Sequence, residues 1–124
     1  MAAVMIVDPK ELKKARKILG FTQIQAGIAL GNVRPETVSR WERALENTRP
    51  KIRILHVETT QQFTEIANLL VELFSENEDR GIFLNTPQQE LDEKSPYDTI
   101  MQDPPNGLRE VASLLGRMAN GIPS

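Results

Sequence analysis

The amino-acid sequence predicts an all-α protein. Apolar residues recur at helical spacing through most of its 124 residues, and several segments begin with a polar N-cap residue followed by proline. No stretch alternates apolar and polar residues for long enough to predict a strand. A chain of this length has room for one compact domain, or for two small helical ones that share a limited core.

The first helix is expected at about 9–19, because Asp8 supplies an N-cap acceptor and Pro9 suits the first helical position. Its apolar residues follow at helical spacing: Leu12, Ala15, Ile18 and Leu19. Gly20 is expected to end this helix, and Thr22 to cap a second, shorter one. The residues of the second helix that we expect to face inward are Ile24, Gly27, Ile28 and Leu30.

The chain then turns at Gly31-Asn32, and Pro35 opens a third helix. The apolar face of this helix carries Val38, Trp41 and Leu45. Thr48 and Pro50 are expected to begin a fourth helix that ends near Val57.

A long amphipathic helix is expected next, capped near Thr59 or Thr60, and we interpret it as the joint between two halves of the chain. Its apolar stripe consists of Phe63, Ile66, Ala67, Leu70, Leu73 and Phe74. A short helix at about 77–84 and a polar stretch follow.

Two more helices complete the prediction. Ser95 and Pro96 supply an N-cap and a first helical position, and the Asp-Pro-Pro-Asn-Gly sequence at 103–107 must interrupt the helical structure. The last helix carries Leu108, Val111, Leu115 and Met118 on one side. Gly121 is expected to end it.

The charges divide the chain into a basic and an acidic half. Residues 1–56 hold eleven Lys/Arg and five Asp/Glu, a net charge of +6, whereas residues 57–124 hold four and twelve, a net charge of −8. A basic half can bind phosphates through counterion release, and an acidic half is repelled by the same polyanion. We therefore predict an N-terminal domain at 8–57, a linking helix at 58–76 and a C-terminal domain at 77–124.

Composition also excludes several classes of protein. The chain has no cysteine and one histidine, so it cannot form disulfides or a Cys/His zinc site, and we expect no metal and no cofactor. No apolar stretch is long enough for a membrane span, and the first seven residues are too short and uncharged for a secretory signal. These features predict a cytoplasmic protein.

Catalysis is not expected. Runs of carboxylates occur at 76–79 and 92–93, but they fall on polar segments where nothing predicts a cleft. No nucleophile elbow, phosphate-binding glycine loop or metal-ligand spacing is present. His56 stands among apolar residues, which is typical of a core or boundary histidine. We predict no catalytic residue.

Two short helices joined by a glycine turn, the second with an inward tryptophan and outward Thr, Ser and Arg, are typical of a DNA-binding helix-turn-helix. Gln23 stands where an amide can meet a phosphate or a base edge, and Arg40 or Arg43 can bind guanine O6 and N7 bidentately. The alternative is that these arginines are solvated or pair with Glu36 or Glu46. The candidate DNA-binding residues are Gln23, Arg34, Glu36, Thr37, Ser39, Arg40 and Arg43.

The sequence here resembles the Xre/Cro family of repressors. The matching stretches are Phe21-Thr22-Gln23, Leu30-Gly31 and the Thr-Val-Ser-Arg-Trp-Glu-Arg run at 37–43. It departs from the family pattern in two places: Gly27 replaces the usual alanine, and five residues rather than four separate Gly31 from Thr37. The longer turn leaves open which of the candidate residues reaches a base. A module of this kind reads a short site, so we expect a homodimer on pseudo-palindromic operator DNA.

The C-terminal half resembles the toxin-binding domain of the Xre, MbcA and ParS antitoxins over about 68–122. The matching residues are Leu73-Phe74, the acidic residues from Glu76 to Asp79, Phe83-Leu84-Asn85-Thr86-Pro87, Leu91, Ser95-Pro96-Tyr97-Asp98, Val111, Leu114-Leu115-Gly116-Arg117 and Gly121. Phe83 replaces a usual tryptophan, and Asp92-Glu93-Lys94 replaces a glycine-rich turn.

This resemblance implies a protein that binds and blocks a cognate toxin, often of the NAD-consuming RES type, and represses its own operon. It implies that the C-terminal end lies at or near the toxin's active site. The residues expected to bind the toxin are Phe83, Leu84, Thr86, Pro87, Gly121, Ile122, Pro123 and Ser124. The alternative is a stand-alone repressor whose C-terminal half dimerises or senses a ligand.

Overall fold

A computed structural model describes residues 9–43 and 54–121 of the chain. Over these ranges it contains seven α-helices and no strand, which confirms the all-α prediction. The helices are α1 (Pro9–Leu19), α2 (Gln23–Ala29), α3 (Pro35–Arg43), α4 (Ile54–Leu73), α5 (Asn77–Leu84), α6 (Pro96–Gln102) and α7 (Asn106–Ala119). A 3-10 turn, η1 (Gln89–Leu91), separates α5 from α6.

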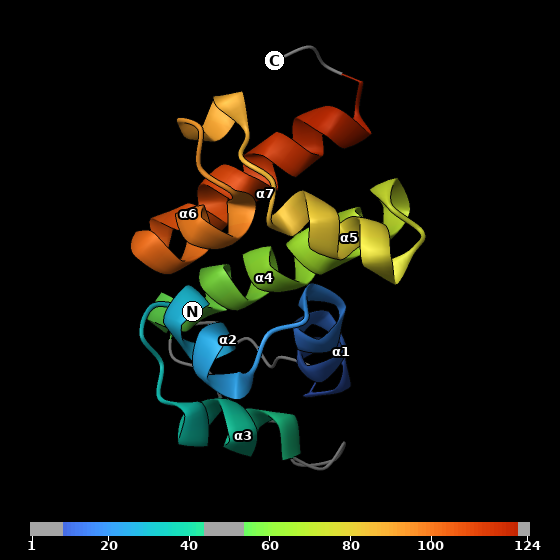
Figure 1. Ribbon diagram of the computed structural model, residues 1–124. Helices are drawn as coiled ribbons and strands as arrows, with labels where there is room; N and C mark the ends of the chain where they lie inside the picture. The colour runs from blue at the N-terminus through green and yellow to red at the C-terminus, as the bar shows by residue number, and fades with distance from the viewer. Residues whose placement is uncertain (1–8, 44–53, 122–124) are drawn as a thin grey trace.

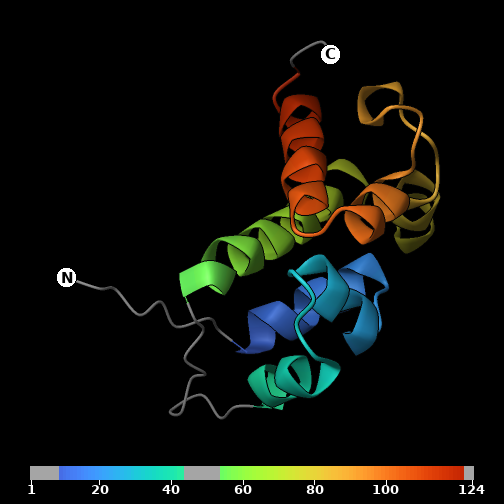
Figure 2. The same cartoon turned by 90° about the vertical axis from the view of Figure 1, so that its left-hand side faces the viewer.

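The long helix α4 lies at the centre of the fold. It packs against α1 on one side and against α7 on the other, so that α1–α3 lie below it and α5–α7 above it in Figure 1. Four of its side chains are completely buried: Phe63, Ile66, Ala67 and Leu70. The same layers are seen from the side in Figure 2. A single apolar core runs through both layers. The division of the chain into the segments 8–57, 58–76 and 77–124 stays a prediction.

Most of the helix ends predicted from local capping residues agree with the helix ends in the structure. α1 and α5 have the predicted bounds, and Gly20 has the positive φ of a helix-ending glycine. Ser95 caps α6 by accepting a hydrogen bond from the backbone N–H of Asp98, 3.1 Å away. The expected interruption before the last helix is confirmed, since α6 ends at Gln102 and α7 begins at Asn106.

The predicted helix start near Thr59 or Thr60 is wrong, and so is the predicted helix end near Val57. α4 is already helical at Ile54 and continues through both threonines, whose hydroxyls donate to the carbonyl oxygen of His56 at 3.1 and 2.9 Å. Threonine is tolerated inside a helix in this way because its hydroxyl can reach the carbonyl one turn earlier. The expected starts at Thr48 and Pro50 lie outside the described residues, as does Leu45.

Two apolar residues expected to face the core are exposed. Ile24 in α2 is 61% exposed and Met118 in α7 is 38% exposed, whereas Trp41 is buried as predicted. The buried residues of α2 are small, Ala26, Gly27 and Ala29, and Ile24 lies on the opposite, exposed side of the helix. Met118 lies in the last turn of α7, beyond the buried leucines.

The polar stretch after α5 forms a compact turn. The backbone N–H of Gln88 donates to the carbonyl oxygen of Lys94 at 3.1 Å, and Asp92 and Glu93 both have positive φ. Leu91 is buried, so this turn is attached to the core. Among the described residues no helix is both long and apolar enough to cross a membrane.

Candidate DNA-binding and toxin-binding surfaces

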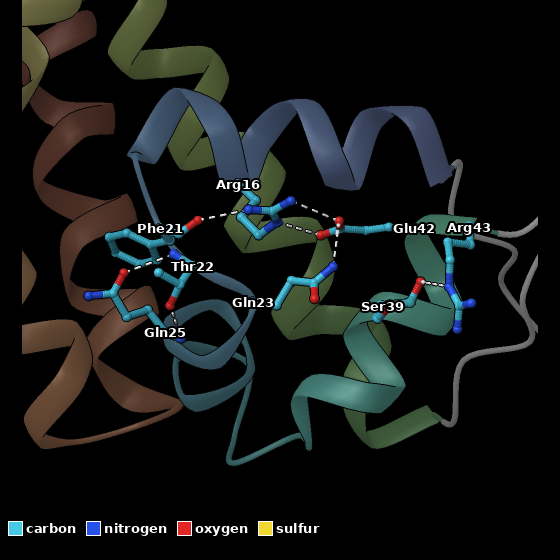
Figure 3. Close-up of polar contacts among 8 residues, drawn as sticks. All are labelled: Arg16, Phe21, Thr22, Gln23, Gln25, Ser39, Glu42 and Arg43. Atoms are coloured by element: carbon cyan, nitrogen blue, oxygen red, sulfur yellow. Dashed lines mark hydrogen bonds and ion pairs between the residues drawn. The ribbon is translucent and has the colours of Figure 1, made fainter.

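A buried ion pair joins α1 to α3. Arg16 donates from Nε to Glu42 Oε2 at 2.7 Å and from Nη2 to Oε1 at 3.0 Å, and its Nη1 donates to the carbonyl oxygen of Phe21 at 3.0 Å. The Glu42 side chain is only 3% exposed. Gln23, the first residue of α2, adds a 3.3 Å hydrogen bond to Glu42 Oε1. As Figure 3 shows, this network fixes the three N-terminal helices relative to one another.

The start of α2 is held from both halves of the fold. Thr22 Oγ1 accepts from the backbone N–H of Gln25 at 3.1 Å, and the backbone N–H of Thr22 donates to Gln25 Oε1 at 2.8 Å, which makes a reciprocal capping box. Gln25 Nε2 also donates to the Tyr97 hydroxyl in α6 at 2.8 Å. The Tyr97 ring contacts Phe21 edge-on, with centroids 5.7 Å apart. Helix α6 of the C-terminal half thus contacts the helix that precedes α3.

The turn between α2 and α3 accounts for Gly27. The backbone N–H of Val33 donates to the carbonyl oxygen of Gly27 at 2.8 Å. A Cβ atom at Gly27 would lie 2.1 Å from the carbonyl oxygen of Val33, far inside van der Waals contact. Asn32 adopts a positive φ of 61° in the same turn. The glycine and the longer turn therefore lie in contact, and we expect that the one requires the other.

The predicted DNA-binding residues only partly gather into one place. Four of the seven, together with Pro35, line a shallow hollow at the junction of α2 and α3: Gln23, Glu36, Ser39 and Arg43. Arg34 and Arg40 are exposed but do not line it, and Thr37 is half-buried. Arg43 Nε donates to the carbonyl oxygen of Ser39 at 3.3 Å.

The exposed arginines of α3, Arg40 and Arg43, are not neutralised by acidic side chains of the described residues. Within the described ranges, neither Arg40 nor Arg43 forms an ion pair, and the alternative pairing with Glu36 does not occur. The other alternative partner, Glu46, lies outside the described residues. The only carboxylate of α3 that takes part in an ion pair in this part of the chain is Glu42, on the inner side. The outer face of α3 can therefore present guanidinium groups to an anionic ligand.

The predicted toxin-binding residues divide into buried and exposed groups. Phe83 and Leu84 belong to the core, and the Phe83 ring packs on Phe74 with centroids 5.1 Å apart. Thr86 and Pro87 are exposed just after α5, and Gly121 is exposed after α7. The remaining three residues, Ile122, Pro123 and Ser124, lie outside the described part of the chain.

Sequence reasoning missed two exposed apolar residues beside these predicted contacts. Ile82 in α5 is 58% exposed and lies four residues before Thr86, and the exposed Met118 lies three residues before Gly121. Because Phe83 and Leu84 face the core, helical geometry turns Ile82 outward. The position of Ile82 relative to Phe83 and Leu84 is the feature of the sequence that could have predicted its exposure. Exposed apolar side chains are what a protein-binding surface offers to a partner.

A further hollow lies between η1, α6 and α7. Its lining carries charges of both signs, including Asp92, Lys94, Arg109 and Glu110, so it does not favour a ligand of one charge. Arg117 at its edge donates from Nη1 to Ser113 Oγ at 3.0 Å. In the described ranges no three His, Asp or Glu side chains are placed to hold a metal ion.

Comparison with known proteins bears on the C-terminal half and on the fold. Residues 69–121 match the family model of the antitoxin Xre/MbcA/ParS C-terminal toxin-binding domain, which confirms the resemblance expected for this half. A solved structure, the M. tuberculosis MbcT-MbcA toxin-antitoxin complex, contains a chain of similar fold, with a TM-score of 0.63 and 18% sequence identity. The similarity covers 95% of this chain and 100% of that one. A sequence comparison with curated proteins gave no match.

Proposed function

We propose that this protein is an antitoxin, which neutralises a cognate toxin by direct binding and represses its own operon by binding DNA. The observation that carries the proposal is the match of residues 69–121 to a toxin-binding domain. The similar chain of the M. tuberculosis complex, an assembly described as toxin-antitoxin, supports it. The resemblance of this segment implies a toxin that in this family is often of the NAD-consuming RES type.

DNA binding is assigned to α2 and α3. The N-terminal half carries the net charge of +6, and the outer face of α3 presents Arg40 and Arg43 without acidic partners in the described part of the chain. A guanidinium matches the paired acceptors of guanine in the major groove. Glu42 and Arg16 hold α3 in place beneath this face. A homodimer on a pseudo-palindromic operator would supply two such helices.

Removing both arginines tests this assignment. The variant Arg40→Ala, Arg43→Ala is expected to weaken operator binding by about 1–3 kcal/mol for each guanine that an arginine no longer binds, and by less if the arginines meet only phosphates. The measurement is fluorescence anisotropy with the DNA that precedes the protein's own gene. Both side chains are exposed, so the unfolding midpoint of the variant is expected to stay close to that of the parent protein.

A matched variant controls for charge. Lys94→Ala, Arg109→Ala removes the same charge from the C-terminal half and is expected to leave operator binding unchanged. If the folded α3 variant binds the operator as tightly as the parent protein does, the assignment of α3 as the recognition helix is wrong.

The toxin-binding surface is assigned to the ends of α5 and α7, where the chain exposes Thr86, Pro87 and Gly121. Deleting residues 121–124 is expected to weaken neutralisation, because the family resemblance implies that this end reaches the toxin's active site. Repression is expected to persist, since the deletion removes none of the candidate DNA-binding residues of α2 and α3. Growth on co-expression with the neighbouring gene product and operator binding in vitro measure the two activities separately.

The same experiment addresses the alternative of a stand-alone repressor. If the full-length protein neither binds nor neutralises a product encoded beside it, yet still binds its operator, a repressor without toxin-binding activity becomes the better interpretation. Loss of both activities in the deletion variant would instead indicate that residues 121–124 stabilise the fold.

A further inference from the structure

The outer side of α1 carries a second concentration of positive charge, separate from the surface on α3. We call it the lysine face, and it consists of Lys10, Lys13, Lys14 and Lys17. These residues are three and four positions apart, so they share one side of the helix, and all are exposed. The opposite side, with Leu12, Ala15 and Leu19, is buried.

The lysine face continues onto α5. Its four lysines line a shallow hollow together with Ile18, Asn77 and Arg80. Arg80 is held at this place because its guanidinium donates to the carbonyl oxygens of Phe74 and Ser75 at 2.7 and 3.1 Å. No acidic residue of the described ranges is among those that line the hollow. The hollow therefore has a purely cationic and neutral lining.

This arrangement does not stabilise α1 itself. Lysines four positions apart repel each other, and cations near a helix N-terminus oppose the helix dipole. Lys13, Lys14 and Lys17 take part in no ion pair within the described part of the chain, so no such pair relieves the repulsion. A bound polyanion would remove it.

We propose that the lysine face binds phosphates of the DNA backbone outside the base pairs contacted by α3. The inference rests on the DNA binding proposed above. Lysine is a compact point charge suited to phosphates rather than to the paired acceptors of a base. α1 packs directly against α3, and in Figures 1 and 2 α3 lies at one end of the molecule with α1 between it and α4. The helix that carries the lysine face is thus the neighbour of α3, and we expect DNA flanking the α3 site to reach it.

The acidic half of a second copy of this chain is a less suitable occupant. Contact between the basic surface of one copy and the acidic surface of the next is heterologous. Such contacts produce open filaments unless the rotation from one copy to the next closes a ring. Duplex DNA instead offers a continuous array of phosphates to several neighbouring lysines at once.

The test uses the full-length variant Lys13→Gln, Lys17→Gln and a random-sequence duplex of about 40 base pairs. The dissociation constant is measured from about 50 to about 200 mM salt. Each phosphate contact contributes about 0.9 to the slope of log affinity against log salt, so the slope is expected to fall by about 2. Across this fourfold range of salt, the parent protein is then expected to lose about tenfold more affinity than the variant.

Two comparisons make the outcome decisive. Lys94→Gln, Arg109→Gln removes the same charge from the C-terminal half and is expected to keep the parent slope. If the parent protein binds no DNA, the proposed DNA binding fails and this inference with it. If the parent binds and the lysine variant has the parent slope, only the inference is overturned. An unchanged slope with weakened binding of the neighbouring gene product would assign the lysine face to a protein partner.

Discussion

Replacing Glu42 by alanine is expected to lower the free energy of unfolding by about 3–5 kcal/mol. The carboxylate is 3% exposed and accepts two hydrogen bonds from Arg16 and one from Gln23. Its removal leaves Arg16, whose side chain is only 16% exposed, without its ion-pair partner and with the Phe21 carbonyl oxygen as its remaining acceptor in the described part of the chain. Urea denaturation followed by circular dichroism measures the change.

The control for this substitution lies on the same helix. Glu36 is exposed, so Glu36→Ala is expected to change the free energy of unfolding by no more than about 0.5 kcal/mol. A double variant, Arg16→Met with Glu42→Leu, removes both charges at similar volume and is expected to be more stable than Glu42→Ala. If Glu42→Ala is no less stable than Glu36→Ala, the ion pair does not stabilise the junction of α1 and α3.

The Glu42 network also shows where sequence reasoning reached its limit. Capping residues such as Thr22 and Ser95 act on the next three or four residues, so the helix starts they mark could be predicted. Helical spacing places Glu42 four positions after the buried Val38, but Arg16 is 26 positions away, and nothing local identifies it as the partner of Glu42. Burial of a charge depends on a tertiary partner, which a pattern of helical spacing does not reveal.

The candidate sites were predictable to different degrees. Helical spacing around the buried Trp41 predicted which residues of α3 lie on its outer face. Phe83 and Leu84 were expected to contact a partner, and both pack in the core. A family motif contains core residues that support a binding surface as well as exposed residues that belong to it, and the motif alone does not tell them apart. The contact between Gln25 and Tyr97, 72 positions apart, was not predicted, since it depends on how the two layers meet across α4.

The turn between α2 and α3 leads to the second large expected effect. Gly27→Ala is expected to lower the free energy of unfolding by about 3 kcal/mol, the upper end of the usual range for overpacked sites. The new Cβ would meet the carbonyl oxygen of Val33 at 2.1 Å, and backbone cannot move aside as a flexible side chain can. The matched control is Gly116→Ala in α7, where a Cβ would meet nothing within 4 Å and alanine favours the helix.

Deleting Asn32 in the Gly27→Ala background tests the stated cause. The deletion shortens the turn to the spacing usual in the Xre/Cro repressors, and it removes a non-glycine residue with a positive φ of 61°. It is also expected to allow Val33 to move away from position 27. We therefore expect the deletion to recover much of the stability that Gly27→Ala removes, although alone, with Gly27 present, it should bring little gain. The measurement is the urea midpoint of all four proteins at equal concentration. Equal stability of Gly27→Ala and Gly116→Ala, or an equal effect of the deletion in both backgrounds, would show that the glycine and the longer turn are independent.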